Sequence, residues 1–289
     1  MNKFNVTTRK LEQKEVLKII KRIVIVSIGV YIFLLLFTHF FLERIILWPR
    51  KLSQEVPSLS IQQGCIENIE LKMKDGTIIR GWFIKKIKSE KMNLLIYFGA
   101  NAEELSSVIS KMANIDEWSV ALINYRGYGM SEGSATETTL YSDSEEIYDY
   151  FINREDINKS NIVVMGRSIG TGVATYLAEK RKISAVILVS PYDNLPNLVQ
   201  NKCLIVPANL ILPHKYDSIG RAPSIEQPLL ILTGSEDGLI PIGHSKRLKE
   251  AWGGKVFYEE LFGESHNSID DVEEYWNKIE KFLFEQESL

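Results

Sequence analysis

Ser168 stands between an apolar segment and a segment suited to a helix, and no other part of the sequence limits the possible folds as strongly. Residues 161–165 are Asn-Ile-Val-Val-Met, residues 166–170 are Gly-Arg-Ser-Ile-Gly, and residues 171–179 continue as a helix-compatible run. This order predicts a strand, a sharp turn and a helix, with the serine at the turn. Glycines at both ends of the turn fit this prediction, because only a residue without a Cβ lets strand and helix pack so closely. The serine oxygen would then be exposed above one edge of a sheet.

A serine acts as a nucleophile when a base takes its proton and an acid orients that base. Residues 228–234 form an apolar run typical of a buried strand, and residues 235–241 follow as a loop that carries Glu236 and Asp237. An acid just beyond the end of such a strand lies on the same sheet edge as Ser168. Asp237 is favoured by its place in the loop, and Glu236 remains the alternative.

The base is expected in the loop after the last strand. Residues 255–261 are interpreted as that strand, and His266 follows it, ahead of an amphipathic helix that should end near Glu285. The other three of the four histidines are His39 in an apolar segment, His214 in a connection and His244 at the start of a helix. A solvated loop histidine is the alternative for His266, but its register with the serine and the acid favours the role of base.

These residues and several loop motifs resemble an α/β-hydrolase of the Bem46-like, ABHD13-type branch, over residues 67–284. The motifs that carry the resemblance are Asp75-Gly76, Gly81-Trp82, Asn101-Ala102-Glu103, Ser190-Pro191 and the segments 124–133, 166–170, 234–241 and 263–267. The resemblance implies an α/β-hydrolase fold and a catalytic triad of Ser168, Asp237 and His266.

The first loop departs from the pattern of that family, which usually reads His-Gly-Asn-Ala where residues 99–102 here read Gly-Ala-Asn-Ala. An oxyanion hole is built from backbone N–H groups, so the change of side chains need not remove it. We expect its donors to be the N–H of Ile169, the residue after the nucleophile, and the N–H of Asn101. Ala100 and Ala102 are the alternatives to Asn101.

The glycine-rich loop of residues 124–133 is expected to serve structure rather than chemistry. Arg126 would anchor the loop through charge-assisted hydrogen bonds, and Tyr128 would also have a structural role. Ser131 lacks the flanking residues of a strained nucleophile and is expected to begin the following turn.

The alternation of apolar strands with helical runs predicts one α/β domain with a mostly parallel central sheet and flanking helices. Residues 65–86, with a turn at Asp75 and Gly76, predict an antiparallel hairpin at the N-terminal edge of that sheet. The connection of residues 192–226 is short and apolar. It would either form the wall of a pocket for an acyl chain or belong to the core, and of these two alternatives the core is favoured.

Residues 23–42 contain no Asp, Glu, Lys or Arg and are rich in Ile, Val, Leu and Phe. As a helix they are long enough to cross a hydrocarbon layer of about 30 Å. No small-residue cleavage site follows, which favours a transmembrane anchor over a cleaved signal peptide. A buried core helix is the third interpretation. Trp48, just beyond the segment, would suit a membrane interface.

Positive charges are more numerous before this segment than after it. They are Lys10, Lys14, Lys18, Lys21 and Arg22 before it, and Arg44, Arg50 and Lys51 after it. The bias predicts a single-pass protein with a cytoplasmic N-terminus and an extracytoplasmic hydrolase domain. The expected organisation is a basic segment at 1–22, a transmembrane helix at 23–42, a linker at 43–64 and the hydrolase domain at 65–289.

Composition argues against several classes of function. The net charge of −3 provides no basic footprint for nucleic acid, and Cys65 and Cys203 are too few for a disulfide framework or a metal site. We expect neither a cofactor nor a metal. The sequence predicts membrane-anchored hydrolysis of a small-molecule ester or thioester, and a position beside a lipid bilayer favours a lipid among such substrates. A peptidase on the same triad and an inactive membrane-tethered scaffold are the alternatives.

Overall fold

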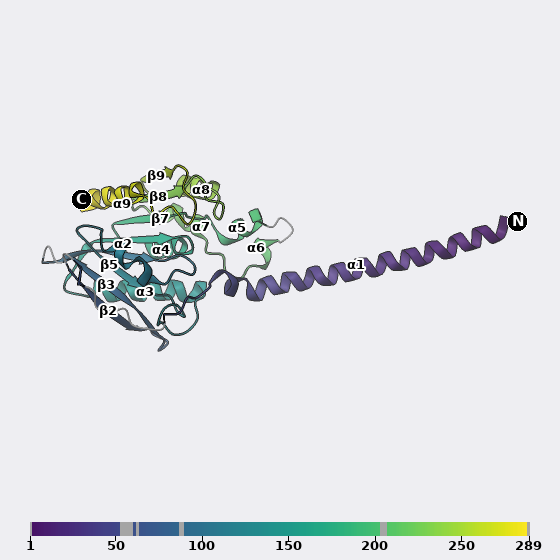
Figure 1. Cartoon of the computed structure of the whole chain (residues 1–289), viewed down its shortest axis with the longest axis horizontal. Coiled ribbons are helices and arrows are strands. Elements are labelled where there is room, and N and C mark those ends of the chain that lie inside the picture. Colours follow the sequence, from purple (N-terminus) through teal and green to yellow (C-terminus); the bar gives the residue numbers. More distant parts are fainter. Residues whose placement is uncertain (1, 53–59, 62–63, 87–89, 203–206, 288–289) are drawn as a thin grey trace.

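Residues 2–52, 60–61, 64–86, 90–202 and 207–287 are described by a computed structural model. Residues 203–206, part of the apolar connection, lie outside these ranges. A long helix, α1 (Asn2–Ile46), projects from an α/β body that contains all the strands (Figure 1).

The elements of the body follow in chain order. The strands are β1 (Ser60–Ile61), β2 (Gly64–Lys72), β3 (Ile78–Lys86), β4 (Met92–Phe98), β5 (Trp118–Ile123), β6 (Ile157–Arg167), β7 (Ala185–Val189), β8 (Leu229–Gly234) and β9 (Val256–Leu261). The helices are α2 (Ile109–Met112), α3 (Glu137–Ile152), α4 (Ile169–Lys180), α5 (Leu195–Lys202), α6 (Ala208–Ile211), α7 (Ser218–Arg221), α8 (Gly243–Ala251) and α9 (Glu273–Glu287), with 3-10 turns η1 (Leu105–Val108) and η2 (Ala222–Ser224).

Within the described ranges, the strands form one nine-stranded sheet in the order β1-β2-β3-β5-β4-β6-β7-β8-β9. The pairs from β1 to β3 and the pair β3–β5 are antiparallel, and the remaining neighbours are parallel. The predicted mostly parallel sheet with an antiparallel hairpin near one edge is confirmed. The strand order reverses at β4, so the loops that follow β4 and β6 run in opposite directions. The crevice between two such loops is where α/β sheets bind ligands.

The two faces of the sheet carry separate cores because side chains alternate along each strand. Leu94 and Ile96 of β4 join the cluster that α3, α4 and α8 cover, and Leu95 and Tyr97 join the cluster beneath α2 and α9. Burial on both faces explains why the parallel strands read as nearly continuous apolar runs.

The glycine-rich loop after β5 is anchored by Arg126, as the sequence predicted. Its Nε and Nη2 donate to the two carboxylate oxygens of Asp143 at 2.8 and 2.7 Å, and its Nη1 donates to Asp75 in the β2–β3 turn. Ser131 is buried and its hydroxyl contacts backbone carbonyls, so its place is structural. The bidentate pair fixes the loop against α3.

The ion pair of Asp75 leads to a pH-dependent prediction. The hydrogen bond from Arg126, with further ones from the backbone and hydroxyl of Thr77, lowers the pKa of Asp75 from 3.8 to about 2. Because the folded pKa lies below the unfolded one, the pair stabilises the fold above pH 3.8, and this contribution is lost as the pH falls to about 2. Asp75→Asn should lower the thermal midpoint at neutral pH by a small amount. The difference from wild type should shrink as the pH falls through about 2 and vanish below it, and a difference that persists below that pH would contradict the assignment.

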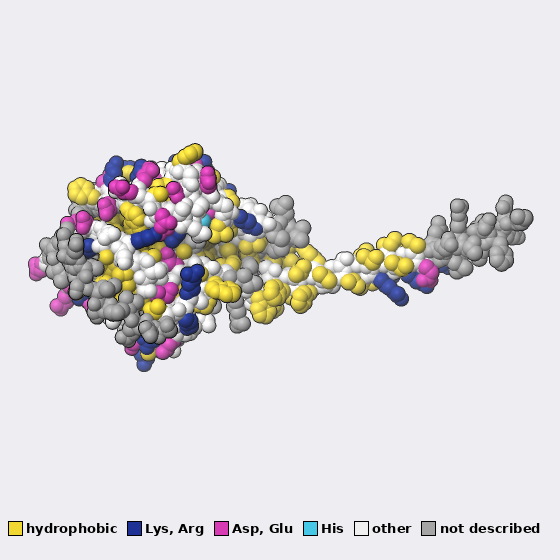
Figure 2. Space-filling view, viewed as in Figure 1, with side chains coloured by type: hydrophobic (Ala, Val, Ile, Leu, Met, Phe, Trp, Pro, Cys, Tyr) yellow, Lys and Arg dark blue, Asp and Glu magenta, His cyan; other side chains and the backbone are white. Residues whose placement is uncertain are grey.

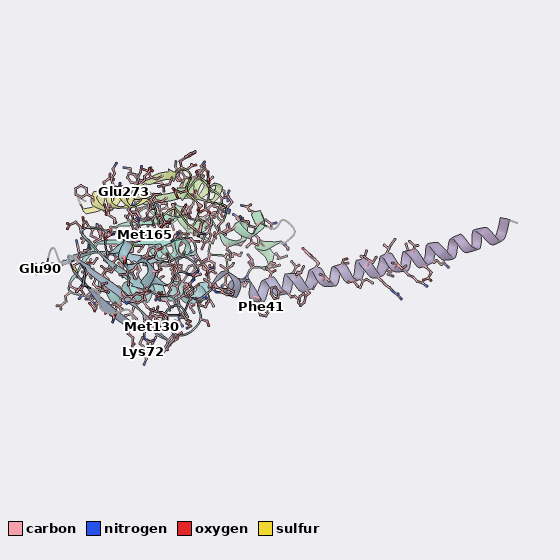
Figure 3. The ribbon with its side chains drawn as sticks, viewed as in Figure 1. Phe41, Lys72, Glu90, Met130, Met165 and Glu273 are labelled. Carbon is pink, nitrogen blue, oxygen red and sulfur yellow. The ribbon has the colours of Figure 1, made fainter. Side chains whose placement is uncertain are left out.

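Helix α1 confirms the predicted apolar helix, and it is longer than the expected 23–42. Residues Lys14–Phe41 are long and apolar enough to cross a membrane, and length and composition fit a membrane anchor and a signal sequence alike. Composition marks the apolar part of a helix rather than its ends, since the flanking Lys, Glu and Leu residues also favour helix. Exposed apolar side chains cover this part of α1 as far as its junction with the body (Figure 2), where Phe41 lies (Figure 3).

Candidate active site

Ser168 occupies the sharp turn between β6 and α4. Its φ of 53° and ψ of −118° form a conformation that residues with a side chain rarely adopt. A Cβ on Gly166 would lie 2.3 Å from the carbonyl oxygen of Gly170, and a Cβ on Gly170 would lie 2.1 Å from that of Phe98. Both glycines therefore have the steric reason that the sequence suggested for them.

The structure brings together the three residues that the sequence proposed as a triad. Nε2 of His266 lies 3.1 Å from Oγ of Ser168, and Nδ1 of His266 lies 2.8 Å from Oδ2 of Asp237. The three residues are only 6–9% exposed. They follow β6, β8 and β9, so parallel strands bring them to one sheet edge. A neutral imidazole that donates from Nδ1 to the acid can accept the serine proton at Nε2.

Asp237 is held in place as the charged partner. Its Oδ1 accepts hydrogen bonds from the N–H groups of Leu239 at 2.9 Å and Ile240 at 2.8 Å. Burial by itself would raise the pKa of Asp237, but the hydrogen bonds from His266 and Ile240 outweigh it and lower that pKa. The alternative acid, Glu236, is exposed. The geometry therefore favours Asp237.

The three candidate N–H groups of the loop after β4 differ in their contacts. The N–H of Ala100 donates to Oε2 of Glu103 at 2.7 Å, and the N–H of Ala102 lies within reach of the Tyr128 hydroxyl. In the part of the chain that the structure describes, the N–H of Asn101 has no hydrogen-bond partner. The hydrogen bonds of the loop thus favour Asn101 over both alternatives.

The other expected donor, Ile169, is the first residue of α4, where backbone N–H groups have no partner within the helix. The side chain of Asn101 has a different task. Its Oδ1 accepts from the N–H of Trp48 at 2.7 Å and from the hydroxyl of Tyr128 at 3.1 Å. The segment that leaves α1 is therefore bonded directly to the candidate oxyanion loop.

Sequence reasoning did not identify Arg167, which directly precedes the serine. Its guanidinium donates to Glu103 at 3.2 Å and to the backbone carbonyl of His266 at 3.1 Å, and it also pairs with Asp270 at 3.1 Å. It thus joins the loop after β4 to the loop that carries the base. The one available signal was a cation at the end of an otherwise apolar strand.

Arg167 should act as a positioning residue. Arg167→Ala should lower kcat for a short ester by about 100-fold, because small displacements of reacting groups have effects of that size. Arg167→Lys, which keeps the charge and loses the planar fork, should recover part of the rate. Rates are measured per mole of folded protein, beside the thermal midpoint. A lower midpoint with an unchanged kcat would reduce Arg167 to a purely structural residue.

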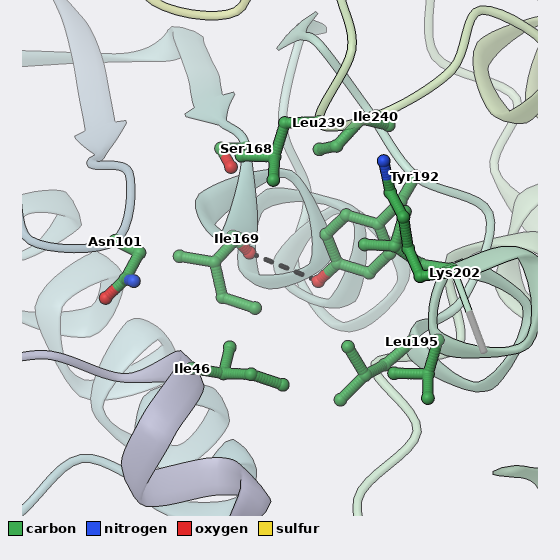
Figure 4. Close-up of a pocket in the computed structure, with 11 residues that line it drawn as sticks. Ile46, Asn101, Ser168, Ile169, Tyr192, Leu195, Lys202, Leu239 and Ile240 are labelled. Atoms are coloured by element: carbon green, nitrogen blue, oxygen red, sulfur yellow. Dashed lines mark hydrogen bonds between the residues drawn. The ribbon is translucent and has the colours of Figure 1, made fainter. Parts of the chain in front are cut away.

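Two hollows meet at Ser168. The apolar one has a volume of about 320 Å³ and lies between α4, α5 and the end of α1 (Figure 4). The polar one has a volume of about 420 Å³ and contains His266, Arg167 and Lys111. Asn101, Ser168 and Leu239 line both. In the part of the chain that the structure covers, no group of three or more His, Cys, Asp or Glu residues is arranged to hold a metal ion.

Comparisons with known proteins agree with this architecture. A family model described as "alpha/beta hydrolase fold" matches residues 94–211. Human "Alpha/beta hydrolase domain-containing protein 17B" is 26% identical over 234 residues, which cover 78% of each chain.

Two solved esterases are similar in structure. An esterase from Pyrococcus furiosus superposes with a TM-score of 0.63 at 18% identity and covers 82% of this chain and 98% of its own. Acetyl xylan esterase 1 from Thermoanaerobacterium gives a TM-score of 0.63 at 15% identity, over 80% of this chain and 86% of its own.

The chain has the α/β-hydrolase fold, with a mostly parallel sheet and antiparallel edge strands. The family model and the human relative support its place in the α/β-hydrolase superfamily, and the two solved esterases share its fold.

Proposed function

We propose that this protein is a serine hydrolase that cleaves a carboxylic ester or thioester. The observation that carries the proposal is the chain of contacts from Asp237 to His266 at 2.8 Å and from His266 to Ser168 at 3.1 Å. A nucleophile, its base and an orienting acid in this order are what acyl transfer needs.

In the proposed reaction, Nε2 of His266 takes the proton of Ser168 as its Oγ attacks the carbonyl carbon. The N–H groups of Ile169 and Asn101 stabilise the oxyanion. The imidazolium then protonates the leaving oxygen or sulfur, and the alcohol or thiol departs from the acyl-enzyme. Water attacks the acyl group with His266 again as base, which releases the acid and restores the serine. Asp237 keeps the imidazole in the required tautomer throughout.

We also propose that the chain belongs to the Bem46-like, ABHD13-type branch, on the loop motifs that it shares with that branch. The proposed organisation is a basic segment at 1–22, a transmembrane helix at 23–42, a linker at 43–64 and a hydrolase domain at 65–289. Excess positive charge before the helix favours a cytoplasmic N-terminus and an extracytoplasmic domain. In sealed vesicles with the cytoplasmic face outward, such a domain resists added protease, whereas its digestion would reverse the orientation.

Hydrolysis of a chromogenic acetate ester by the full chain in detergent tests the proposed activity. We expect turnover of this ester to exceed that of a matched aminoacyl anilide, because an alcohol leaves more readily than an amine. Preferential cleavage of the anilide would favour a peptidase. No turnover of either compound by folded protein would favour the inactive scaffold.

A further inference from the structure

The two hollows at Ser168 differ in chemistry and in their relation to the base. His266 lines the polar hollow, together with its neighbour Asn267, and is not among the residues that line the apolar hollow. Each hollow reaches the serine itself. A substrate that spans Ser168 therefore has one part beside the base and the other part in the apolar hollow.

The reaction decides which part of the substrate lies on which side. In the proposed mechanism the leaving oxygen or sulfur receives its proton from Nε2 of His266, so the leaving group must lie beside the imidazole. That places the leaving group in the polar hollow. The acyl group, which stays attached to Ser168, then occupies the apolar hollow.

The walls of each hollow suit these assignments. Leu195 and Leu198 of α5 and Ile240 of the acid loop line the apolar hollow. The hydroxyl of Tyr192 donates to the carbonyl of Ile169 at 3.3 Å (Figure 4). Lys202 also lines this hollow, and its ammonium group donates a hydrogen bond to the carbonyl of Gly238 at 2.5 Å.

The polar hollow is lined by ion pairs that can exchange hydrogen bonds with a polar group. Lys111 lies 2.7 Å from Asp270 and 2.8 Å from Asp271, and Arg167 lies 3.2 Å from Glu103. Together with Arg50, which also lines this hollow, the cations equal the carboxylates in number, so the lining favours a hydroxylated or otherwise polar leaving group without selecting a charge.

The apolar hollow also adjoins the end of the apolar helix. Ile46, the last residue of α1, forms part of its wall (Figure 4). Ile46 follows Phe41, where the apolar stretch ends, by five residues, which is about 8 Å along a helix. His39 of α1 contacts the carbonyl of Ile211 in α6 at 2.5 Å, so the helix also touches the segment beyond α5.

We infer that the site is selective for esters or thioesters that join a long apolar acyl chain to a polar leaving group. The acyl chain enters the apolar hollow beside Ile46 from the bilayer that holds α1. This inference rests on the proposed function and adds the orientation and the class of the substrate. Esters that join a short polar acid to a long alkyl alcohol should bind poorly, because their alkyl chain would have to lie among the ion pairs beside His266.

A pair of isomers tests the orientation directly. Hydroxyethyl decanoate has its alkyl chain on the acyl side, and decyl glycolate has a chain of nearly the same length on the alcohol side. We expect the full chain in detergent to cleave the decanoate at least ~10-fold faster in kcat/KM, the scale on which a pocket discriminates between apolar groups. Equal rates or a preference for the glycolate would overturn the inference.

Variants locate this selectivity in the apolar hollow. Leu198→Trp fills the hollow and should reduce the ratio of decanoate to acetate turnover by about 10-fold. Leu210→Trp is the matched control, because Leu210 is 84% exposed and does not line the hollow, and its ratio should equal that of wild type. Rates are expressed per site that reacts with a fluorophosphonate, so misfolded molecules are not counted.

The outcomes separate the two proposals. Acetate turnover and fluorophosphonate labelling without the predicted preference among isomers would overturn the inference and leave the serine hydrolase intact. Absence of both acetate turnover and labelling in folded protein would overturn the proposed function, and the inference with it. An unchanged ratio in Leu198→Trp would remove the apolar hollow as the acyl site.

Discussion

Replacing Ser168 with alanine is expected to lower kcat for ester hydrolysis on the order of 10⁴-fold or more. The variant loses the nucleophile and keeps the oxyanion donors, so a small rate above that of water should remain. His266→Ala should lower kcat by a similar factor. The double variant should be little worse than either single one, because the two side chains act as one unit. Steady-state kinetics on an acetate ester, with detergent-solubilised full chain, measures all three.

The control for this comparison is Ser142→Ala, on the exposed surface of α3. It should leave kcat unchanged. Additive losses in the double variant would mean that Ser168 and His266 contribute separately, which disagrees with the 3.1 Å contact between Nε2 and Oγ. Activity that survives in Ser168→Ala at the wild-type level would assign the chemistry to another residue.

The second large effect is expected from Gly170→Ala. The added Cβ would lie 2.1 Å from the carbonyl oxygen of Phe98, so β4 and α4 must separate. We expect a loss of about 3 kcal/mol, at the upper end of what overpacking costs. For a domain of this size, that corresponds to a drop of about 10 °C in the thermal midpoint. Loss of activity should accompany it, because the same contact holds the serine turn against the loop after β4.

Gly238→Ala provides the matched control, since a Cβ at that position meets no atom within 4 Å. Its midpoint should stay close to that of wild type. If both glycine variants have the same thermal midpoint as wild type, α4 does not approach β4 as closely as described, and the steric explanation of the serine turn is wrong.

The sequence predicted the fold and the position of the candidate triad from local patterns. An apolar strand, two glycines and a following helix were enough to place Ser168 at a turn. The ends of two later strands were enough to place Asp237 and His266 on the same edge, because parallel strands end together. The expected hairpin of residues 65–86 has its counterpart in β2 and β3, and the resemblance to a known family supported the same arrangement.

Features that depend on contacts between distant segments could not be predicted in the same way. Arg167 contacts Glu103 and the carbonyl of His266, which lie 64 and 99 residues away, and no local pattern encodes such a bridge. The contacts of the three candidate N–H groups also depend on a distant segment, since the carboxylate of Glu103 that accepts from the N–H of Ala100 is bound by Arg167 of β6.

For the connection after β7, composition alone could not predict which apolar residues lie in the core and which line the hollow. The sequence favoured the core for its apolar residues, and the structure divides them. Leu212 is buried in the core, whereas Leu198 packs against the core and also lines the hollow at the serine. An apolar side chain is suited to either place, and only the position of α5 and of Ile46 decides between them.

Reaction with a fluorophosphonate, followed by mass spectrometry of the labelled peptide, tests most directly whether Ser168 is an activated nucleophile. We predict stoichiometric labelling of the full chain, located on the peptide that contains Ser168 and abolished in both Ser168→Ala and His266→Ala. Folded wild-type protein that remains unlabelled, or that carries the label on a different residue, would contradict the account.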